Sequence, residues 1–168
     1  RKIMETVMRA TVCAMAAEGF PYKGVLYAGL MVAGGRINVL EFNARFGDPE
    51  TQPLMMRMKS DIVPVMEAVC NGTLHECSLD IDERAAVCVV MTAGGYPGRY
   101  DKGLPISGLG SVSRMKDVVV FHAGTRAKGK QIVTDGGRVL GVTALGSTVE
   151  QAITRAYGAV SRISWKDS

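Results

Sequence analysis

Residues 39–53 read VLEFNARFGDPETQP and join the end of an apolar strand to a loop that is dense in polar side chains. The strand half carries Glu41 and Asn43 among apolar neighbours, and the loop half carries Arg45 and Asp48 beside a glycine and a proline. Core packing gives no reason to place so many polar groups at a strand end, whereas a ligand does. The stretch therefore predicts a ligand-binding site where this strand ends.

The strand residues Glu41 and Asn43 are two positions apart. Because side chains alternate along a strand, both are expected on one face, about 6.5–7 Å apart along the chain. A carboxylate and an amide oxygen are hard ligands that suit Mg²⁺, with water and substrate phosphates filling the other positions. The pattern is equally compatible with a solvent-facing pair at a sheet edge, so the residues alone leave both interpretations open.

The loop offers complementary chemistry. The guanidinium of Arg45 presents a planar fork of donors that matches phosphate or carboxylate, and Asp48 can accept hydrogen bonds from an amine or from sugar hydroxyls. The alternative is a surface ion pair of Arg45 with Asp48 or Glu50, which would contribute little to stability.

The chain before and just after this stretch predicts helices around a hairpin. Apolar residues recur at helical spacing from Met4 to Met15, with no capping residue at the start. Strands are expected over residues 25–33 and 36–43, joined by the two-residue turn Gly34-Gly35. Helices are expected over residues 53–58 and 60–70, with Ser60 as a possible N-cap and Asn71-Gly72 as the stop.

Beyond the polar stretch 75–84 the pattern changes to short strands between glycine-rich turns. They are expected at residues 85–93, 118–123, 130–135 and 138–145, before a helix from about 148 to 163 with a capping box that starts at Ser147. We therefore predict an α+β protein of two domains. Residues 1–78 form the first, a hairpin with helices, and residues 79–168 form the second, a small, β-rich, barrel-like domain with a final helix.

Two glycine-rich stretches could be taken for phosphate sites. Residues 124–130, GTRAKGK, fit the phosphate-binding loop pattern, but Gln131 replaces the hydroxyl residue and a strand follows where a helix is required, so a hairpin loop is predicted. Residues 93–103, AGGYPGRYDKG, can cradle a phosphate or simply turn a strand back, and both interpretations stay open. His122, in an apolar strand, is expected to be a core residue.

Composition restricts the class of protein. Of 168 residues, 47% are apolar and 21% charged, so a folded core is expected and disorder is not. No apolar run reaches the roughly 20 residues of a membrane helix, and the four cysteines show no paired spacing, which indicates a cytoplasmic protein. The net charge of +4 is scattered, so neither a nucleic acid nor a membrane is an expected partner. The pI near 9 leaves a non-catalytic polyanion-binding domain as a remote alternative.

The order of several motifs resembles one enzyme family. LYAGLMVAGGRINVLEFNARFGDPETQPLMMRMKSD (26–61) is similar to the end of the ATP-grasp region of the phosphoribosylamine–glycine ligase family, also called glycinamide ribonucleotide synthetases. DERAAVCVVMTAGGYPG, VFHAGT, TDGGRVLGVTALGSTVEQA and RAY resemble that family's C-terminal domain. The resemblance implies the C-terminal part of a longer enzyme, which agrees with the uncapped start at Arg1.

The resemblance also implies an activity and roles for residues. It assigns Glu41 and Asn43 as the Mg²⁺ (or Mn²⁺) ligands that bind ATP through its phosphates, Arg45 as a catalytic and substrate-binding residue, and Asp48 as a substrate-binding residue. The implied reaction is that of an ATP-dependent ligase of purine biosynthesis, which joins glycine to 5-phosphoribosylamine through glycyl phosphate.

In one respect the chain departs from the wider ATP-grasp pattern, because the strand before Glu41 lacks a carboxylate. A two-ligand metal site is therefore expected. The chain by itself is expected to be inactive, since the N-terminal part of the enzyme would be a necessary partner. The nearest alternative is another ATP-grasp carboxylate–amine ligase.

Overall fold

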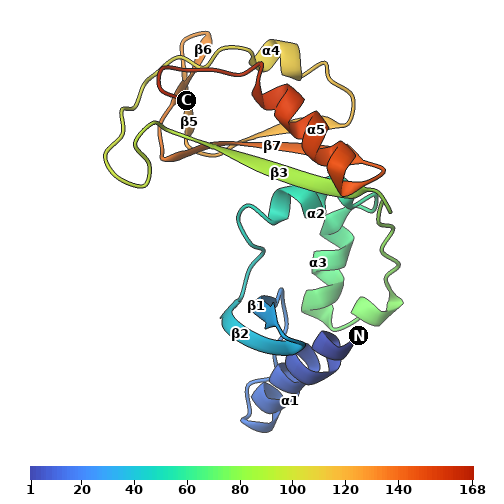
Figure 1. Cartoon of the computed structure of the whole chain (residues 1–168). Coiled ribbons are helices and arrows are strands. Elements are labelled where there is room, and N and C mark those ends of the chain that lie inside the picture. Colours follow the sequence, from blue (N-terminus) through green and yellow to red (C-terminus); the bar gives the residue numbers. More distant parts are fainter. The chain divides into compact units, whose positions relative to one another are not determined.

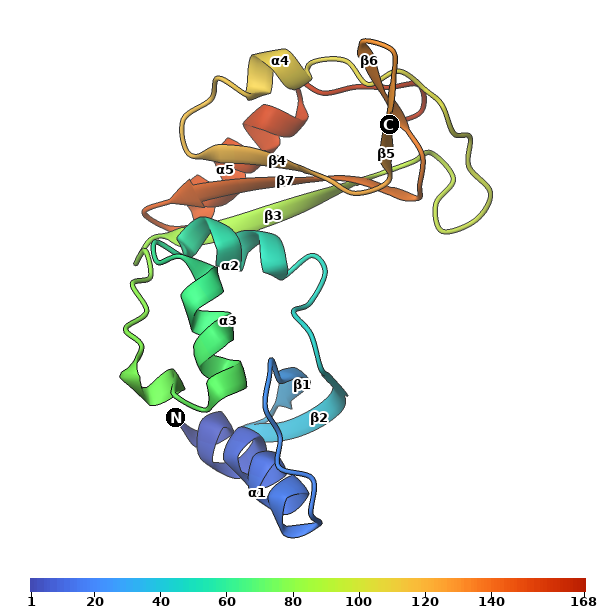
Figure 2. The same cartoon turned by 180° about the vertical axis from the view of Figure 1, so that it is seen from behind.

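The computed structural model describes all 168 residues, which form two compact units of mixed helices and antiparallel strands (Figures 1 and 2). The first unit contains residues 1–47 and 60–79, and the second contains residues 48–59 and 80–168. The predicted α+β class is confirmed. The predicted domain boundary between residues 78 and 79 stays a prediction, because the two compact units describe packing and do not test where the domains divide.

The first unit is built from helices and one hairpin. Its elements are the π-helix η1 (Met4–Arg9), α1 (Ala10–Ala17), β1 (Tyr27–Ala33), β2 (Arg36–Asn43), α3 (Ile62–Asn71) and the 3₁₀ turn η2 (Leu74–Glu76). Strands β1 and β2 pair antiparallel around Gly34 and Gly35, whose φ angles are 55° and 73°. Two consecutive positive φ angles define a tight hairpin turn for which glycine is suited, so the predicted hairpin is confirmed.

Helix α3 shows where the capping prediction was wrong. The N-cap is Asp61 and not Ser60, because the Asp61 carboxylate accepts a 2.9 Å hydrogen bond from the Val63 backbone N–H. Both residues can cap a helix, so their order in the chain alone did not decide between them. The helix ends as predicted at Gly72, whose φ of 77° is left-handed.

The second unit has a three-stranded sheet at its centre. Its elements are α2 (Thr51–Arg57), β3 (Ala85–Thr92), α4 (Leu109–Val112), β4 (Val118–His122), β5 (Thr125–Lys128), β6 (Gln131–Thr134), β7 (Arg138–Gly146) and α5 (Val149–Val160). The sheet has the antiparallel order β3-β7-β4, and β5 pairs with β6 as a separate hairpin. The strands do not close into a barrel. No helix of the structure has the length and apolarity that crossing a membrane requires.

Strand β7 is the core of this unit. Every residue from 139 to 146 is buried, with no alternation between the two faces. The reason is that β7 is the central strand and that helices α5 and α2 pack against opposite faces of the sheet (Figures 1 and 2). A strand covered on both faces can be apolar throughout, which the run VLGVTAL indicates.

Helix α5 approaches the sheet through its small residues. Ala152, Ala156 and Ala159 are fully buried along one face of the helix. Gly146 lies so close to the backbone of Ala152 that a side chain there would collide with it. The helix is capped by Thr148, which accepts from the Gln151 N–H at 3.3 Å, and not by Ser147 as predicted, whose hydroxyl donates to the Gln151 side chain.

Two further predictions concern the region around β5. The stretch 124–130 contains no helix, but it is not the hairpin loop that was predicted, because Thr125–Lys128 is a strand of its own that pairs with β6 around a turn at Gly129-Lys130. The prediction for His122 was wrong, because it is exposed at the end of β4 and its Nδ1 lies 3.0 Å from the Thr125 hydroxyl.

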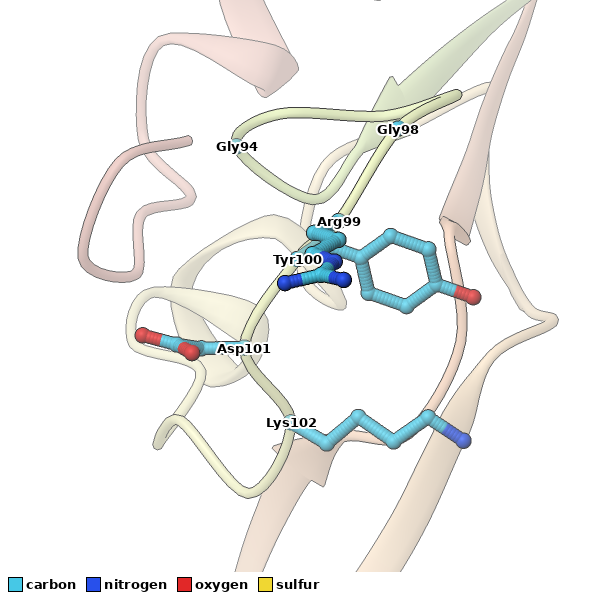
Figure 3. A pocket seen from close by; sticks show the side chains of 6 residues that line it. All are labelled: Gly94, Gly98, Arg99, Tyr100, Asp101 and Lys102. Carbon is cyan, nitrogen blue, oxygen red and sulfur yellow. The ribbon is translucent and has the colours of Figure 1, made fainter.

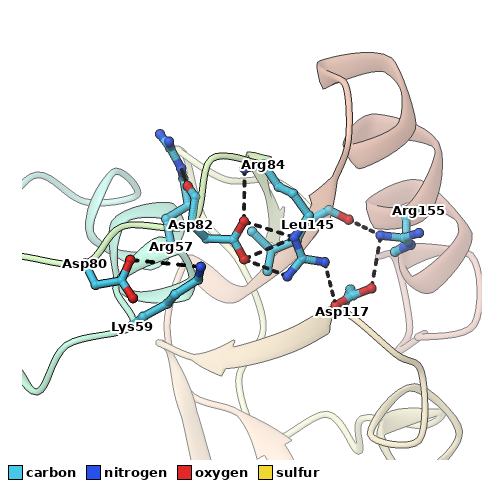
Figure 4. Close-up of polar contacts among 8 residues, drawn as sticks. All are labelled: Arg57, Lys59, Asp80, Asp82, Arg84, Asp117, Leu145 and Arg155. Atoms are coloured by element: carbon cyan, nitrogen blue, oxygen red, sulfur yellow. Dashed lines mark hydrogen bonds and ion pairs between the residues drawn. The ribbon is translucent and has the colours of Figure 1, made fainter.

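A chain of ion pairs attaches the segment before β3 to the sheet (Figure 4). The guanidinium of Arg84 bridges two carboxylates, Asp82 at 2.7 Å and Asp117 at 3.0 Å, and Arg155 binds both Asp117 and the carbonyl of Leu145. Hydrogen bonds from the Arg84 side chain and backbone hold the pKa of Asp82 well below its usual range.

This network predicts acid sensitivity at Asp82. A carboxyl whose folded-state pKa is lowered contributes stability above its unfolded pKa of about 3.9, and the contribution is lost as pH falls toward the folded value. The variant Asp82→Asn should therefore melt at a lower temperature than the native chain at pH 7, and the difference should shrink below about pH 4. Thermal melting from pH 7 to pH 3 measures this, with Asp101→Asn, which lacks an ion pair, as the control. A difference that stays constant across this range would contradict it.

Candidate functional site

The predicted metal ligands lie together at the end of β2. The Asn43 side-chain nitrogen donates a hydrogen bond to Glu41 Oε1 at 3.0 Å, so both side chains are on one face of the strand, as the alternation predicted. Glu41 is exposed and Asn43 is half-buried. The two groups are therefore accessible to a ligand from solvent.

The opposite strand makes room for Glu41. Gly29 on β1 pairs with Glu41, and a side chain at Gly29 would come within 3.0 Å of Glu41 Cγ. Next to this pair the register shifts, because Leu30 pairs with Val39 and Leu40 is left as an extra residue. Such a bulge re-aims the residues beside it. Gly29 and the bulge together determine where the carboxylate of Glu41 points.

The geometry of the pair fits a small divalent cation. Neighbouring ligands of an octahedral Mg²⁺ at 2.0–2.1 Å are about 3 Å from each other, and the Glu41 and Asn43 polar atoms are 3.0 Å apart. A half-turn of the Asn43 amide exchanges its nitrogen for its oxygen, which would then be the ligand atom. The structure contains no group of three or more histidine, cysteine or acidic side chains that could hold a metal, so water and phosphate oxygens would complete this shell.

Arg45 follows two residues after Asn43 and is exposed. Its guanidinium donates to the Phe46 carbonyl at 3.0 Å, which uses one of its five donors. The other donors of the guanidinium are free to meet an anion, and the role predicted for Arg45 stays a prediction.

Asp48 belongs to the second unit, where two side chains hold its carboxylate. Arg138 at the start of β7 lies 3.3 Å from Asp48 Oδ2 and also donates to the Asp48 carbonyl at 3.1 Å, while Gln52 donates to Oδ1 at 3.3 Å. The peptide bond between Asp48 and Pro49 is cis. Asp48 is half-exposed, so one side of its carboxylate stays open to a substrate.

Sequence reasoning missed Arg138. It is 90 residues from Asp48 in the chain, and no local pattern connects the two. The one available signal was its place at the start of an apolar strand, directly after Gly136 and Gly137, where a charged residue does not serve the core. The structure thus adds Arg138 as the residue that orients Asp48.

Comparison with known proteins identifies the family of the chain. Two models of one family match, phosphoribosylglycinamide synthetase, ATP-grasp (A) domain, over residues 1–51 and phosphoribosylglycinamide synthetase, C domain, over residues 86–168. These matches describe a protein in which ATP-grasp structure is followed by a C domain. The chain belongs to the phosphoribosylglycinamide synthetase family.

Individual relatives agree with the family. Phosphoribosylamine–glycine ligase of Allochromatium vinosum is 54% identical over 99% of this chain and 39% of its own length, and that of Escherichia coli strain K12 is 53% identical with the same coverage. A solved phosphoribosylamine–glycine ligase from Thermotoga maritima is 31% identical with a TM-score of 0.83, over 99% of this chain and 40% of its own. The chain thus spans about 39% of the length of the curated relatives it matches.

A more distant structure shows the same fold. N5-carboxyaminoimidazole ribonucleotide synthetase from Thermotoga maritima has a TM-score of 0.57, covering 96% of this chain and 42% of its own, but only 16% sequence identity. At this identity the likeness concerns the fold alone.

The Arg138–Asp48 contact generates a prediction about loop order. Arg138→Gln should increase amide hydrogen exchange in residues 47–52, because the Asp48 carbonyl and carboxylate lose their partner. Global stability should change by at most about 1 kcal/mol, since the pair is largely exposed. Exchange mass spectrometry measures both effects, with the exposed Arg114→Gln as the matched control. Equal exchange in the two variants would show that Arg138 does not hold the loop.

Proposed function

We propose that this chain is part of an ATP-dependent ligase that joins glycine to 5-phosphoribosylamine and releases glycinamide ribonucleotide, ADP and phosphate, a step of purine biosynthesis. The observation that carries the proposal is the Glu41–Asn43 pair, with its polar atoms 3.0 Å apart, inside the segment that matches an ATP-grasp domain. The names of the relatives support the choice of substrates.

The metal pair would prepare ATP for transfer. Glu41 and Asn43 would hold Mg²⁺ or Mn²⁺, and the ion would neutralise charge on the ATP phosphates when bound. The absence of a side chain at Gly29 leaves room for the Glu41 carboxylate, and a half-turn of the Asn43 amide would exchange its hydrogen bond to Glu41 for a bond to the metal.

The reaction has two steps, and the loop would have to bind an anionic transferring group and the acceptor. In the first, a glycine carboxylate oxygen attacks the γ-phosphorus of ATP, which forms glycyl phosphate and releases ADP. In the second, the amine of 5-phosphoribosylamine attacks the glycyl carbonyl and phosphate leaves. Arg45 would bind the anionic transferring group in both steps, because its fork matches phosphoryl oxygens. Asp48, oriented by Arg138, would accept hydrogen bonds from the amine or hydroxyls of the acceptor.

The proposal includes the preceding part of the enzyme as a partner and the cytoplasm as the location. Residues 1–78 would be the end of an ATP-grasp domain and residues 79–168 the C domain, and a preceding part of the same polypeptide would supply the remaining ATP-binding groups. The four cysteines are free thiols, which supports a reducing compartment such as the cytoplasm. Membership of the family argues against a different ATP-grasp carboxylate–amine ligase and against a polyanion-binding domain.

The first expected outcome is that the 168-residue chain alone has no ligase activity. Positioning of two substrates and ATP requires groups that it would receive from the rest of the enzyme, and misplaced reactants lose several kcal/mol of the advantage of proximity. Phosphate release assayed with ATP, glycine and 5-phosphoribosylamine should show no dependence on the two acceptor substrates. Release that depends on both would prove the chain sufficient.

The second concerns the metal pair in the enzyme that contains this chain and the preceding part. Glu41→Gln should preserve the fold, raise the Mg²⁺ concentration needed for half-maximal rate, and lower turnover sharply, because a neutral amide is a weaker ligand than a carboxylate. A Mg²⁺ titration of the rate measures this, and Glu18→Gln, an exposed residue on the same unit, is the control. Identical titrations of the two variants would remove Glu41 from the metal site.

The third concerns Arg45 in the same enzyme. Arg45→Lys keeps the charge but loses the planar fork, so it should raise the activation barrier by roughly 2–4 kcal/mol while leaving the melting temperature nearly unchanged. Turnover at saturating ATP and glycine measures the effect, and Arg114→Lys is the control because Arg114 is exposed and far along the chain. If the two variants have the same rate, Arg45 is a surface residue without a role in catalysis.

A further inference from the structure

A cavity of about 570 Å³ lies on the second unit, beside the loop that follows β3 (Figure 3). The residues that line it are Gly94, Gly98, Arg99, Tyr100, Asp101 and Lys102. Its volume is within the range of small-molecule sites, about 300–1,000 Å³. This is the glycine-rich stretch whose sequence allowed either a phosphate cradle or a simple turn, and neither the metal pair nor Arg45 belongs to it.

We propose that this cavity binds the phosphate group of a phosphate monoester, held by Arg99 and Lys102. The proposal rests on the proposed function only for the choice among phosphate esters, because the cavity and its charges belong to this chain alone.

The glycines give the loop a defined shape. Gly95 has a φ of 91°, and a side chain there would collide with the carbonyl of Arg99. Gly94 lies against the backbone of Asp167 so closely that a side chain would overlap it. Glycine at these positions lets the chain fold back tightly and bring Arg99 next to the turn. The loop is therefore packed against its own residue 99 and against Asp167 near the end of the chain.

The charged side chains are available to an anion. Arg99 makes no ion pair or side-chain hydrogen bond in the structure, and Lys102 is 3.8 Å from Asp135, at the outer limit of an ion pair. In Figure 3 the Asp101 carboxylate points away from Lys102, on the opposite side of the loop. The guanidinium fork and the ammonium together suit a dianionic phosphate better than a single carboxylate.

The cavity lies at the same end of the sheet as Asp48. The rings of Tyr96 and Tyr100 pack against Gly137, where a side chain would collide with Tyr96, and the next residue, Arg138, binds Asp48. The Ala93 N–H also donates to the Gly137 carbonyl at 2.8 Å. Residues 137 and 138 therefore connect the cavity loop with the predicted acceptor residue inside one unit. A sugar phosphate whose hydroxyls face Asp48 is the ester that this placement favours, and free phosphate is the other source of the same chemistry.

The test is a titration of the 168-residue chain with ribose 5-phosphate and, separately, inorganic phosphate, followed by amide NMR shifts of residues 94–102 and by calorimetry. Arg99→Gln and Lys102→Gln should each weaken binding about tenfold or more, because each removes a charged hydrogen-bond donor. Arg114→Gln and Lys116→Gln are matched controls, since both are exposed cations of the same unit without ion pairs. All four positions are exposed, and thermal melting checks that each variant is folded.

The outcomes separate the possibilities. Tighter binding of ribose 5-phosphate assigns the cavity to a sugar phosphate, and equal or tighter binding of inorganic phosphate assigns it to free phosphate; both support a phosphate site. Absence of shifts in residues 94–102 at millimolar ligand, or equal weakening by the control variants, overturns it. The titration contains no ATP, metal or glycine, so failure of this site is distinguishable from failure of the proposed ligase function.

Discussion

Burial of β7 on both faces is the constraint on which the second unit depends. The strand pairs with β3 on one side and β4 on the other, while α5 and α2 cover its two faces. Because no side of β7 meets solvent between residues 139 and 146, its residues must be apolar or small, and Gly146 allows α5 to approach. The two ends of this strand are where polar chemistry can begin, and Arg138 is placed at one of them.

Local patterns in the sequence were sufficient for the hairpin of the first unit, for most helices and strands, and for the placement of Glu41 and Asn43 on one face, whereas α4 and β5 were not predicted. The alternation of a strand places Glu41 and Asn43 on one face, and Gly34-Gly35 specifies the hairpin that presents them. Caps were less predictable, since Ser60 and Asp61 compete for the same role and the backbone conformation of Asp61 decides it. The contact between Arg138 and Asp48 could not be read from the chain, because it arises only when β7 is placed at the centre of the sheet.

The two units achieve stability differently. The second has a continuous core around β7, α5 and Trp165, with many fully buried side chains. In the first, large apolar side chains such as Met31, Val32 and Leu40 are more than half exposed on the hairpin. Apolar exposure of this extent on a two-stranded ribbon is expected when stability comes from packing beyond the ribbon itself. Glu41 and Asn43 thus lie on an element that contributes little core, and their geometry depends on backbone pairing and on Gly29.

The distance along the chain between Asp48 and its partner has a consequence for biosynthesis. The ribosome adds roughly 5–20 residues each second, and N-terminal segments emerge first. Asp48 precedes Arg138 by 90 residues, so Asp48 is synthesised well before the guanidinium that binds it. At those rates the delay is roughly 5–18 s. Throughout that time the nascent loop lacks the Arg138 contact that holds the Asp48 carboxylate. A nascent chain that stops short of β7 therefore carries Glu41 and Asn43 without the contact that orients Asp48.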